Sequence, residues 1–249
     1  MSEHRHLERE DERPPSVHTL LTVLVTIGIV AVVIGALAVA SLASGSTRTA
    51  ANRLDVGDEP QLAIRSTDAD VQLIEGTSSD IVIRAKVTSG LIDTTYELRR
   101  RGHEIEVVGS CMNWLSPGCG VVVTVAVPAK LPVLVATDSA DVTVSSLRDR
   151  VVTIATGSGD INGSGLRVQE FSARAQAGDI TANFAEQPFA LKARTKSGDI
   201  FARLPMGEIE YAVTVESGSG GVKSEFESVA GGKGIVQAFS DSGDIHLRR

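Results

Sequence analysis

Aspartate recurs at one position of a short repeated phrase, and these carboxylates have the clearest capacity for chemistry in the chain. The phrase reads TDADV at 67–71, GSGDI at 157–161 and KSGDI at 196–200. Carboxylates stacked a few ångströms apart repel one another, and a Ca²⁺ ion between them would relieve that repulsion. A calcium column is therefore one interpretation of four of these residues: Asp141, Asp160, Asp179 and Asp199.

The second interpretation of the same aspartates is structural, and it is the favoured one. Aspartate in a turn commonly accepts hydrogen bonds from backbone N–H groups. The spacing does not match the nine-residue repeats of calcium-binding β-helices. Carboxylates about 5 Å apart also serve retaining glycosidases, but near-equivalent aspartates offer no distinct acid and nucleophile. No Ser/His/Asp or Cys/His arrangement stands out, so the sequence indicates neither an enzyme nor a cofactor.

The spacing of the phrase predicts the fold. The key positions Asp141, Asp160, Asp179, Asp199, Gly221 and Asp244 lie 19, 19, 20, 22 and 23 residues apart. Apolar residues stand eight and six positions before them and one after, and a small residue stands four before. This is strand alternation that runs into a turn. One unit cannot bury its own apolar face, but stacked units build a continuous core. We therefore predict an all-β fold, a β-solenoid of roughly 20-residue coils, with a β-sandwich of the same strands as the alternative.

The remaining segments are expected to close the two ends of this stack. Alternation predicts strands at 81–88, 94–100, 104–110 and 121–130, which would cover the N-terminal end. The segment 246–249 would finish the other end, where its arginines would discourage edge-to-edge pairing.

An uncharged apolar segment precedes the repeats. Residues 19–43 are long enough for one transmembrane helix, with a cytoplasmic disordered tail at 1–18, a linker at 44–56 and an extracytoplasmic domain at 57–249. The alternative is a cleaved secretory signal, because Ala38, Val39 and Ala40 resemble a cleavage site. A short tail before a large domain favours a cytoplasmic N-terminus.

Cysteines and basic residues provide the other candidate sites. Cys111 and Cys119 are expected to form a disulfide in an external domain, with two free thiols as the alternative. Arg174, Lys192, Arg194 and Lys196 form a local basic cluster, which is either a patch for an anionic ligand or a solvated face. The formal net charge of -7 argues against a nucleic-acid partner.

With these repeats behind a membrane segment, the chain resembles the bacterial DUF4097 family of adhesin-like β-repeat proteins, and is similar to the head GIN auto-transporter-adhesin group. The resemblance rests on the repeated phrase over residues 55–249. It implies a β-helix-like fold exposed at the cell envelope and carries over no catalytic residue.

The sequence thus predicts a non-catalytic, single-pass membrane protein that binds or scaffolds at the cell surface. Its expected partners are the membrane and a cell-wall polymer or envelope protein. The alternative function is envelope-stress sensing through a partner membrane protein. Oligomeric state is left open.

Overall fold

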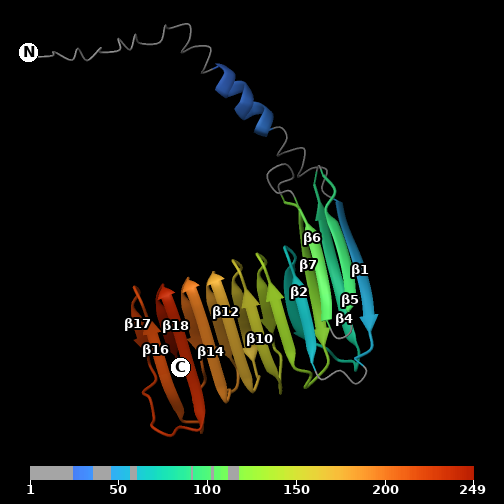
Figure 1. Ribbon diagram of the computed structural model, residues 1–249. Helices are drawn as coiled ribbons and strands as arrows, with labels where there is room; N and C mark the ends of the chain where they lie inside the picture. The colour runs from blue at the N-terminus through green and yellow to red at the C-terminus, as the bar shows by residue number, and fades with distance from the viewer. Residues whose placement is uncertain (1–24, 36–45, 57–60, 91, 102–103, 112–117) are drawn as a thin grey trace, which may run out of the picture.

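Two β-sheets lie face to face along the whole repeat region of the computed structural model (Figure 1). The structure describes residues 25–35, 46–56, 61–90, 92–101, 104–111 and 118–249. A helix occupies 25–35, inside the segment predicted to cross a membrane, and the rest of that segment lies outside the described residues. Among the helical residues that the structure describes, none belongs to a helix long and apolar enough to span a bilayer.

The larger sheet, sheet A, contains ten strands. In spatial order they are β1 (Ser46–Leu54), β4 (Ile81–Ser89), β7 (Gly120–Val127), β3 (Asp70–Glu75), β9 (Val142–Ser145), β11 (Ile161–Leu166), β13 (Ile180–Phe184), β15 (Ile200–Arg203), β19 (Ile245–Arg248) and β17 (Val222–Ser224).

The facing sheet, sheet B, contains nine strands. From the same end as β17, they are β16 (Tyr211–Ser217), β18 (Gly234–Ser242), β14 (Ala190–Ser197), β12 (Glu170–Ala177), β10 (Val151–Thr156), β8 (Val133–Thr137), β2 (Leu62–Ser66), β6 (Glu104–Ser110) and β5 (Thr95–Arg101). Each sequence repeat supplies one strand of sheet B, a turn, and one strand of sheet A. We call that unit a coil.

Residues at the same position of the sequence repeat pair with one another in the sheets. Phe171, eight residues before its key aspartate, pairs in parallel with Val152 and Leu191, which hold the same position in their coils. Ile180, one residue after the aspartate, pairs likewise with Ile161 and Ile200. The prediction of an all-β fold is confirmed in its coarser form, because the structure is mostly β and has two parallel-rich sheets. The two sheets pack against each other as in a sandwich, but like positions of different repeats pair in parallel, as stacked coils require.

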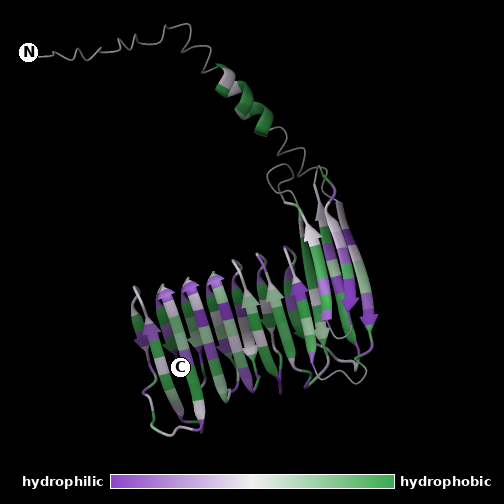
Figure 2. Ribbon diagram, viewed as in Figure 1, coloured by the Kyte–Doolittle hydropathy of each residue, from purple (hydrophilic) through white to green (hydrophobic). Residues whose placement is uncertain are grey.

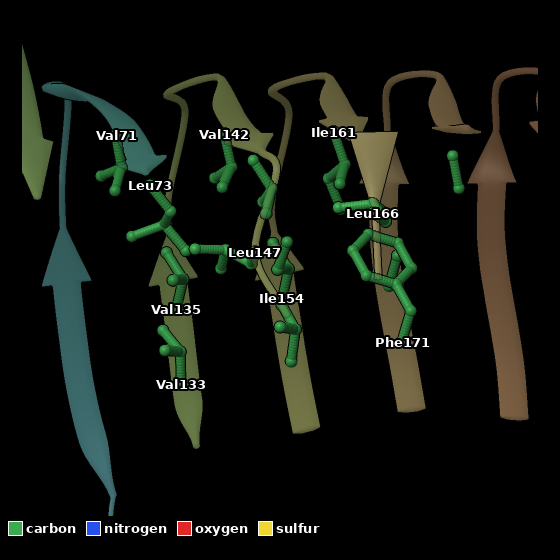
Figure 3. Packing of buried hydrophobic residues seen from close by; sticks show 14 of the residues in the cluster. Val71, Leu73, Val133, Val135, Val142, Leu147, Ile154, Ile161, Leu166 and Phe171 are labelled. Carbon is green, nitrogen blue, oxygen red and sulfur yellow. The ribbon is translucent and has the colours of Figure 1, made fainter. Parts of the chain in front are cut away.

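The core lies between the sheets, where residues of one type sit over residues of the same type. Figure 3 shows Val71, Val142 and Ile161 in one row, with Val135 and Ile154 below them on the strands of sheet B. All five are inaccessible to solvent. The outward positions between them are more polar, so hydropathy alternates along the strands (Figure 2). Burial of these branched side chains on a pleated surface is the main force that holds the coils together.

Glycine at the turns allows the coils to approach closely. Gly178, Gly198 and Gly243 precede their key aspartates and have φ of 143°, 148° and 154°. A Cβ atom at Gly198 would collide with the carbonyl oxygen of Gly178 in the neighbouring coil. The turn therefore needs glycine for space as well as for backbone conformation.

The last coils are not stacked in chain order, which corrects the expected C-terminal end. The coil of β18 and β19 lies between the coil of β14 and β15 and the coil of β16 and β17. Consequently β19 is an inner strand, and β17 forms the edge of sheet A. The prediction that 246–249 ends the stack is wrong. Repeat spacing sets the register of the strands but carries no information about which coils are neighbours.

At the opposite end, the predicted strands extend both sheets. Strands β6 and β7 pair in parallel with β2 and β3, and β5 and β4 then add antiparallel strands. The sequence predicted a linker at 44–56, but β1 lies there and pairs antiparallel with β4. This strand is almost entirely exposed, and its small and polar residues give no apolar alternation. Backbone pairing, rather than burial, holds it in place.

Candidate functional site

The turn aspartates form a hydrogen-bond ladder along the stack, which we call the Asp ladder. In each step the carboxylate Oδ1 of one coil accepts a hydrogen bond from the backbone N–H of the key residue in the next coil. The steps in spatial order are Asp70 from Asp141 (3.2 Å), Asp141 from Asp160 (2.8 Å), Asp160 from Asp179 (2.8 Å), Asp179 from Asp199 (2.7 Å), Asp199 from Asp244 (2.7 Å) and Asp244 from Gly221 (2.7 Å). These carboxylates join one coil to the next.

The ladder explains the one repeat without an aspartate. Gly221 lies in the coil of β16 and β17 at the end of the stack. Its N–H donates to Asp244, so it completes the last step. No further coil follows it among the described residues, and no carboxylate is needed there to receive another N–H.

Asp70, at the other end of the ladder, has a distinct environment. Burial raises the pKa of its carboxyl group, the hydrogen bond from the Asp141 N–H lowers it, and the charge of Asp141 raises it; the net direction is upward. Within the described part of the chain, no group of three or more His, Cys, Asp and Glu side chains is arranged to hold a metal ion. The calcium interpretation stays a hypothesis, which thermal unfolding with Ca²⁺ and with chelator would test.

A column of buried hydroxyl groups, which sequence reasoning missed, runs beside the ladder. Thr195 Oγ1 and Ser240 Oγ donate to the carbonyl oxygens of Gly178 (3.1 Å) and Gly198 (2.9 Å), and Thr156 Oγ1 accepts from the Gly159 N–H (2.9 Å). These residues stand four positions before the key aspartate, where the sequence indicated only a small side chain. Because Ser and Thr alone fill that position in six of the seven coils, their hydroxyl groups were the available signal.

Three of the four residues in the predicted basic cluster line one shallow hollow on the outer face of sheet B. The hollow has a volume of about 120 Å³ and is lined by Arg174, Lys192 and Arg194, with Phe239 beside them. Arg174 and Arg194 are register neighbours on β12 and β14. Lys196 is exposed but is not among the lining residues.

Two of these cations already have partners. Lys192 Nζ forms an ion pair with Glu170 (2.6 Å), and the Arg194 guanidinium lies 5.8 Å from the centre of the Phe239 ring. Both contacts join neighbouring coils. Arg174 has no ion pair with any carboxylate in the described residues, so it contributes the least compensated charge to this hollow.

An inward-pointing arginine is the main polar feature that the sequence did not reveal. The Arg150 side chain is fully buried; it forms an ion pair with Glu75 (2.6 Å) and donates to the carbonyl oxygens of Pro128 (2.8 Å) and Arg148 (3.0 Å). Burial lowers the pKa of the guanidinium, and the neighbouring carboxylate of Glu75 raises it, with a net lowering. The ion pair with Glu75 joins the end of β3 to the segment before β10, and the bond to Pro128 joins that segment to the end of β7, so the site is structural.

The expected disulfide is present: Cys111 and Cys119 are bonded, with their Cα atoms 5.9 Å apart. The chain-entropy model gives a loop of this size about 2.5 kcal/mol of stabilisation. The loop residues between them, 112–117, lie outside the described residues, as does the whole N-terminal tail.

Taken together, the features above describe a stacked β-repeat domain whose turn carboxylates hold the coils in register. Residues 132–248 match the family model described as Toastrack DUF4097. The family resemblance predicted from the sequence is confirmed over that range. No curated protein matches the chain.

Several solved structures match this chain at low sequence identity. A "putative cell adhesion protein" from Clostridium sporogenes has 11% identity and a TM-score of 0.47, covering 82% of this chain and 99% of its own. A "putative adhesin" from Bacteroides fragilis has 13% identity and a TM-score of 0.27, covering 82% and 97%. One from Parabacteroides merdae has 12% identity and a TM-score of 0.28, covering 82% and 95%. Similarity at this level carries no argument about what this chain binds.

Proposed function

We propose that this chain is a non-catalytic protein of the bacterial cell envelope, anchored in the membrane by residues 19–43. Its β-solenoid domain would lie outside the cell and bind or scaffold an anionic surface polymer. The N-terminus would be cytoplasmic. No cofactor takes part in this role.

The proposal rests on the role of the turn carboxylates, which accept hydrogen bonds from the backbone of the next coil. Catalysis by paired carboxylates needs two groups in different environments, one acting as the acid and the other as the base or nucleophile. Here Oδ1 of each ladder aspartate is occupied by a backbone N–H of the next coil. The same interaction keeps the coils in parallel register and thereby holds the outer side chains of each sheet in regular rows. Such rows suit an extended ligand, as in other repeat proteins.

The outer face of sheet B supplies a first contact surface. Arg174, Lys192 and Arg194 project from adjacent coils around one hollow. Guanidinium groups on neighbouring strands can each pair with an anionic group of a polymer, and the surface potential would attract such a polymer from solution.

Co-sedimentation of the purified full chain with cell-wall preparations tests this role. We expect binding to walls that carry anionic polymer and little binding to walls from which it has been extracted. Arg174→Gln combined with Arg194→Gln should weaken binding at least fivefold.

The matched control is Arg84→Gln with Lys86→Gln, which removes two charges from exposed positions of β4 and should leave binding unchanged. Equal binding to both wall preparations would overturn the proposal. Selective recovery of a membrane signalling protein, without polymer binding, would instead favour the sensing role.

A further inference from the structure

We propose a second binding site, on the outer face of sheet A, for an anionic polysaccharide whose acidic groups contact Arg203 and Arg248 and whose sugar ring packs on Phe201. This inference rests on the proposed binding role and names the ligand class for a surface other than the sheet B hollow. The two sites can fail independently, because they use different residues on opposite sheets.

Two rows of outward side chains change character in the same pair of coils. In the first row, two positions after the key aspartate, polar residues give way to aromatic ones: Gln72, Thr143, Asn162 and Thr181 are followed by Phe201 and His246. In the second row, two positions further along, Ser145 pairs with Ser164 and the register of β11 then shifts. Beyond that shift, uncharged Asn183 is followed by Arg203 and Arg248. A joint change in two rows marks a local site on an otherwise repetitive face.

The coil order creates the arginine pair. Arg203 on β15 and Arg248 on β19 are 45 positions apart in sequence but are register neighbours in the sheet. Neighbouring strands lie about 4.8 Å apart, and like charges directly opposite each other are destabilising. Neither arginine forms an ion pair with a carboxylate of the described residues, so an anion bound between them would relieve the repulsion.

The arginines line real hollows in the surface. One, of about 490 Å³, is lined by Phe201, Arg203, His246, Arg248 and Arg249, with Asn183. A second, of about 620 Å³, shares Asn183, Arg203 and Arg249 with the first. No acidic side chain lines either hollow among the described residues. The carboxylate of Glu225 lies nearby and accepts a hydrogen bond from the Arg249 backbone N–H (3.0 Å).

An exposed aromatic ring beside the arginine pair favours a saccharide over a simple anion. Phe201 is 39% exposed. Its ring meets the His246 ring edge to face, with centroids 5.0 Å apart, which fixes its orientation. A guanidinium pairs with a carboxylate through two parallel hydrogen bonds. A uronic acid presents such a carboxylate on a ring whose C–H face can cover the exposed phenyl group.

Calorimetric titration of the full chain with three probes tests the site: tetragalacturonate, tripolyphosphate and the neutral sugar maltotetraose. We expect tetragalacturonate to bind at least tenfold more tightly than either of the others. Arg203→Gln with Arg248→Gln should lower its affinity at least tenfold. Phe201→Ser should remove the preference over tripolyphosphate. The control, Arg84→Gln with Lys86→Gln, removes two charges from exposed positions of β4 in the same sheet and should change tetragalacturonate affinity less than twofold.

Each outcome of these titrations supports or overturns the proposed site. Wild-type affinity in the Arg203/Arg248 variant, at an unchanged thermal midpoint, would overturn the site. Equal affinity for tetragalacturonate and tripolyphosphate would overturn the saccharide assignment. It would also be overturned if tetragalacturonate does not bind but anionic lipid vesicles do, with vesicle binding lost in the Arg203→Gln/Arg248→Gln variant. If Arg174→Gln with Arg194→Gln loses wall binding but keeps tetragalacturonate binding, this site is separate from the sheet B patch.

Discussion

A single carboxylate oxygen at each turn carries much of the specificity of the stack. The Asp179 Oδ1 atom accepts the N–H of Asp199, and Asp199 does the same for Asp244. Core packing alone would tolerate several alignments of similar apolar residues, but this bond is made only when key position meets key position. Aspartate at the turn thus selects register, while the buried valine and isoleucine side chains supply most of the stabilisation.

Replacing one ladder residue should weaken the stack measurably. Asp179→Ala leaves the Asp199 N–H without its acceptor, and we expect the free energy of unfolding to fall by about 1–2 kcal/mol. Asp179→Asn keeps an oxygen at Oδ1 and should cost less than half as much. Urea denaturation of the two variants checks this, and equal losses would show that the charge, not the bond to Asp199, is what matters.

Calcium should not stabilise the ladder, because no three acidic, His or Cys side chains of the described residues are arranged to hold an ion. A ligand that prefers the folded state must raise the thermal midpoint. We therefore expect the same midpoint in millimolar Ca²⁺ and in chelator. A clear rise with Ca²⁺, lost in Asp160→Asn, would restore the metal interpretation of the column.

Stability should fall at alkaline pH because of Tyr211. Its hydroxyl group donates to the Pro188 carbonyl oxygen (2.8 Å), and burial raises its pKa to about 12. An unfolded tyrosine loses its proton near pH 10. The contribution is therefore intact below pH 10 and is lost as pH rises toward 12. Denaturant titrations at pH 9, 10.5 and 11.5 measure this slope, which Tyr211→Phe should flatten.

At the scale of elements, the turn is a closely packed contact between coils as well as a link between strands. Gly198 faces the Gly178 carbonyl oxygen, and Ser240 Oγ donates to the Gly198 carbonyl oxygen (2.9 Å). The turns are therefore stacked as tightly as the strands. A side chain at this position would force adjacent coils apart.

Gly198→Ala should destabilise the domain by more than 2 kcal/mol, since it adds a backbone collision to the strain of a positive φ. Gly231 provides the matched control: its φ is +76°, but a Cβ there would meet no atom within 4 Å. Gly231→Ala should cost about 1 kcal/mol, from conformation alone. Thermal unfolding compares the two, and equal losses would rule out the inter-coil contact as the cause.

The sequence predicted strand register more fully than it predicted the neighbours of each coil. Apolar periodicity fixes which residues face inward, so the alignment of Phe171 with Val152 and Leu191 follows from spacing. Periodicity says nothing about coil order. The Arg203 and Arg248 pair was therefore invisible, because stacking in chain order would have separated those residues by a whole coil. Strand β1 was missed since its residues bury almost nothing.

At the scale of the whole molecule, the two ends of the stack are built differently. Antiparallel strands β1, β4 and β5 extend the N-terminal end, while β16 and β17 form the other. Part of the β16 edge is covered by a local segment: Ser228 Oγ accepts from the Val213 N–H (2.9 Å), and the Val229 N–H donates to the Tyr211 carbonyl oxygen (2.9 Å). Such cover reduces the backbone available for pairing with another chain.

Protection from hydrogen exchange should follow spatial order, not chain order. Strand β19 lies between β15 and β17, and its Ile245 N–H donates to the Gly221 carbonyl oxygen (2.9 Å). We expect backbone amides of β19 to exchange at least tenfold more slowly than those of β17, which has a neighbour on one side only. Native-state exchange read by NMR tests this. Equal rates for the two strands would contradict the inserted position of β19.

The inserted coil also sets the order in which the domain can be completed as it is synthesised. Residues 211–224 emerge first but reach their final neighbours only after residues 234–248 have entered the gap beside β14 and β15. Until then the growing end is a bare parallel edge. A nascent chain that pauses between these two segments would present that edge to other chains, so the interval between them is the stage at which the protein is most exposed to misassembly.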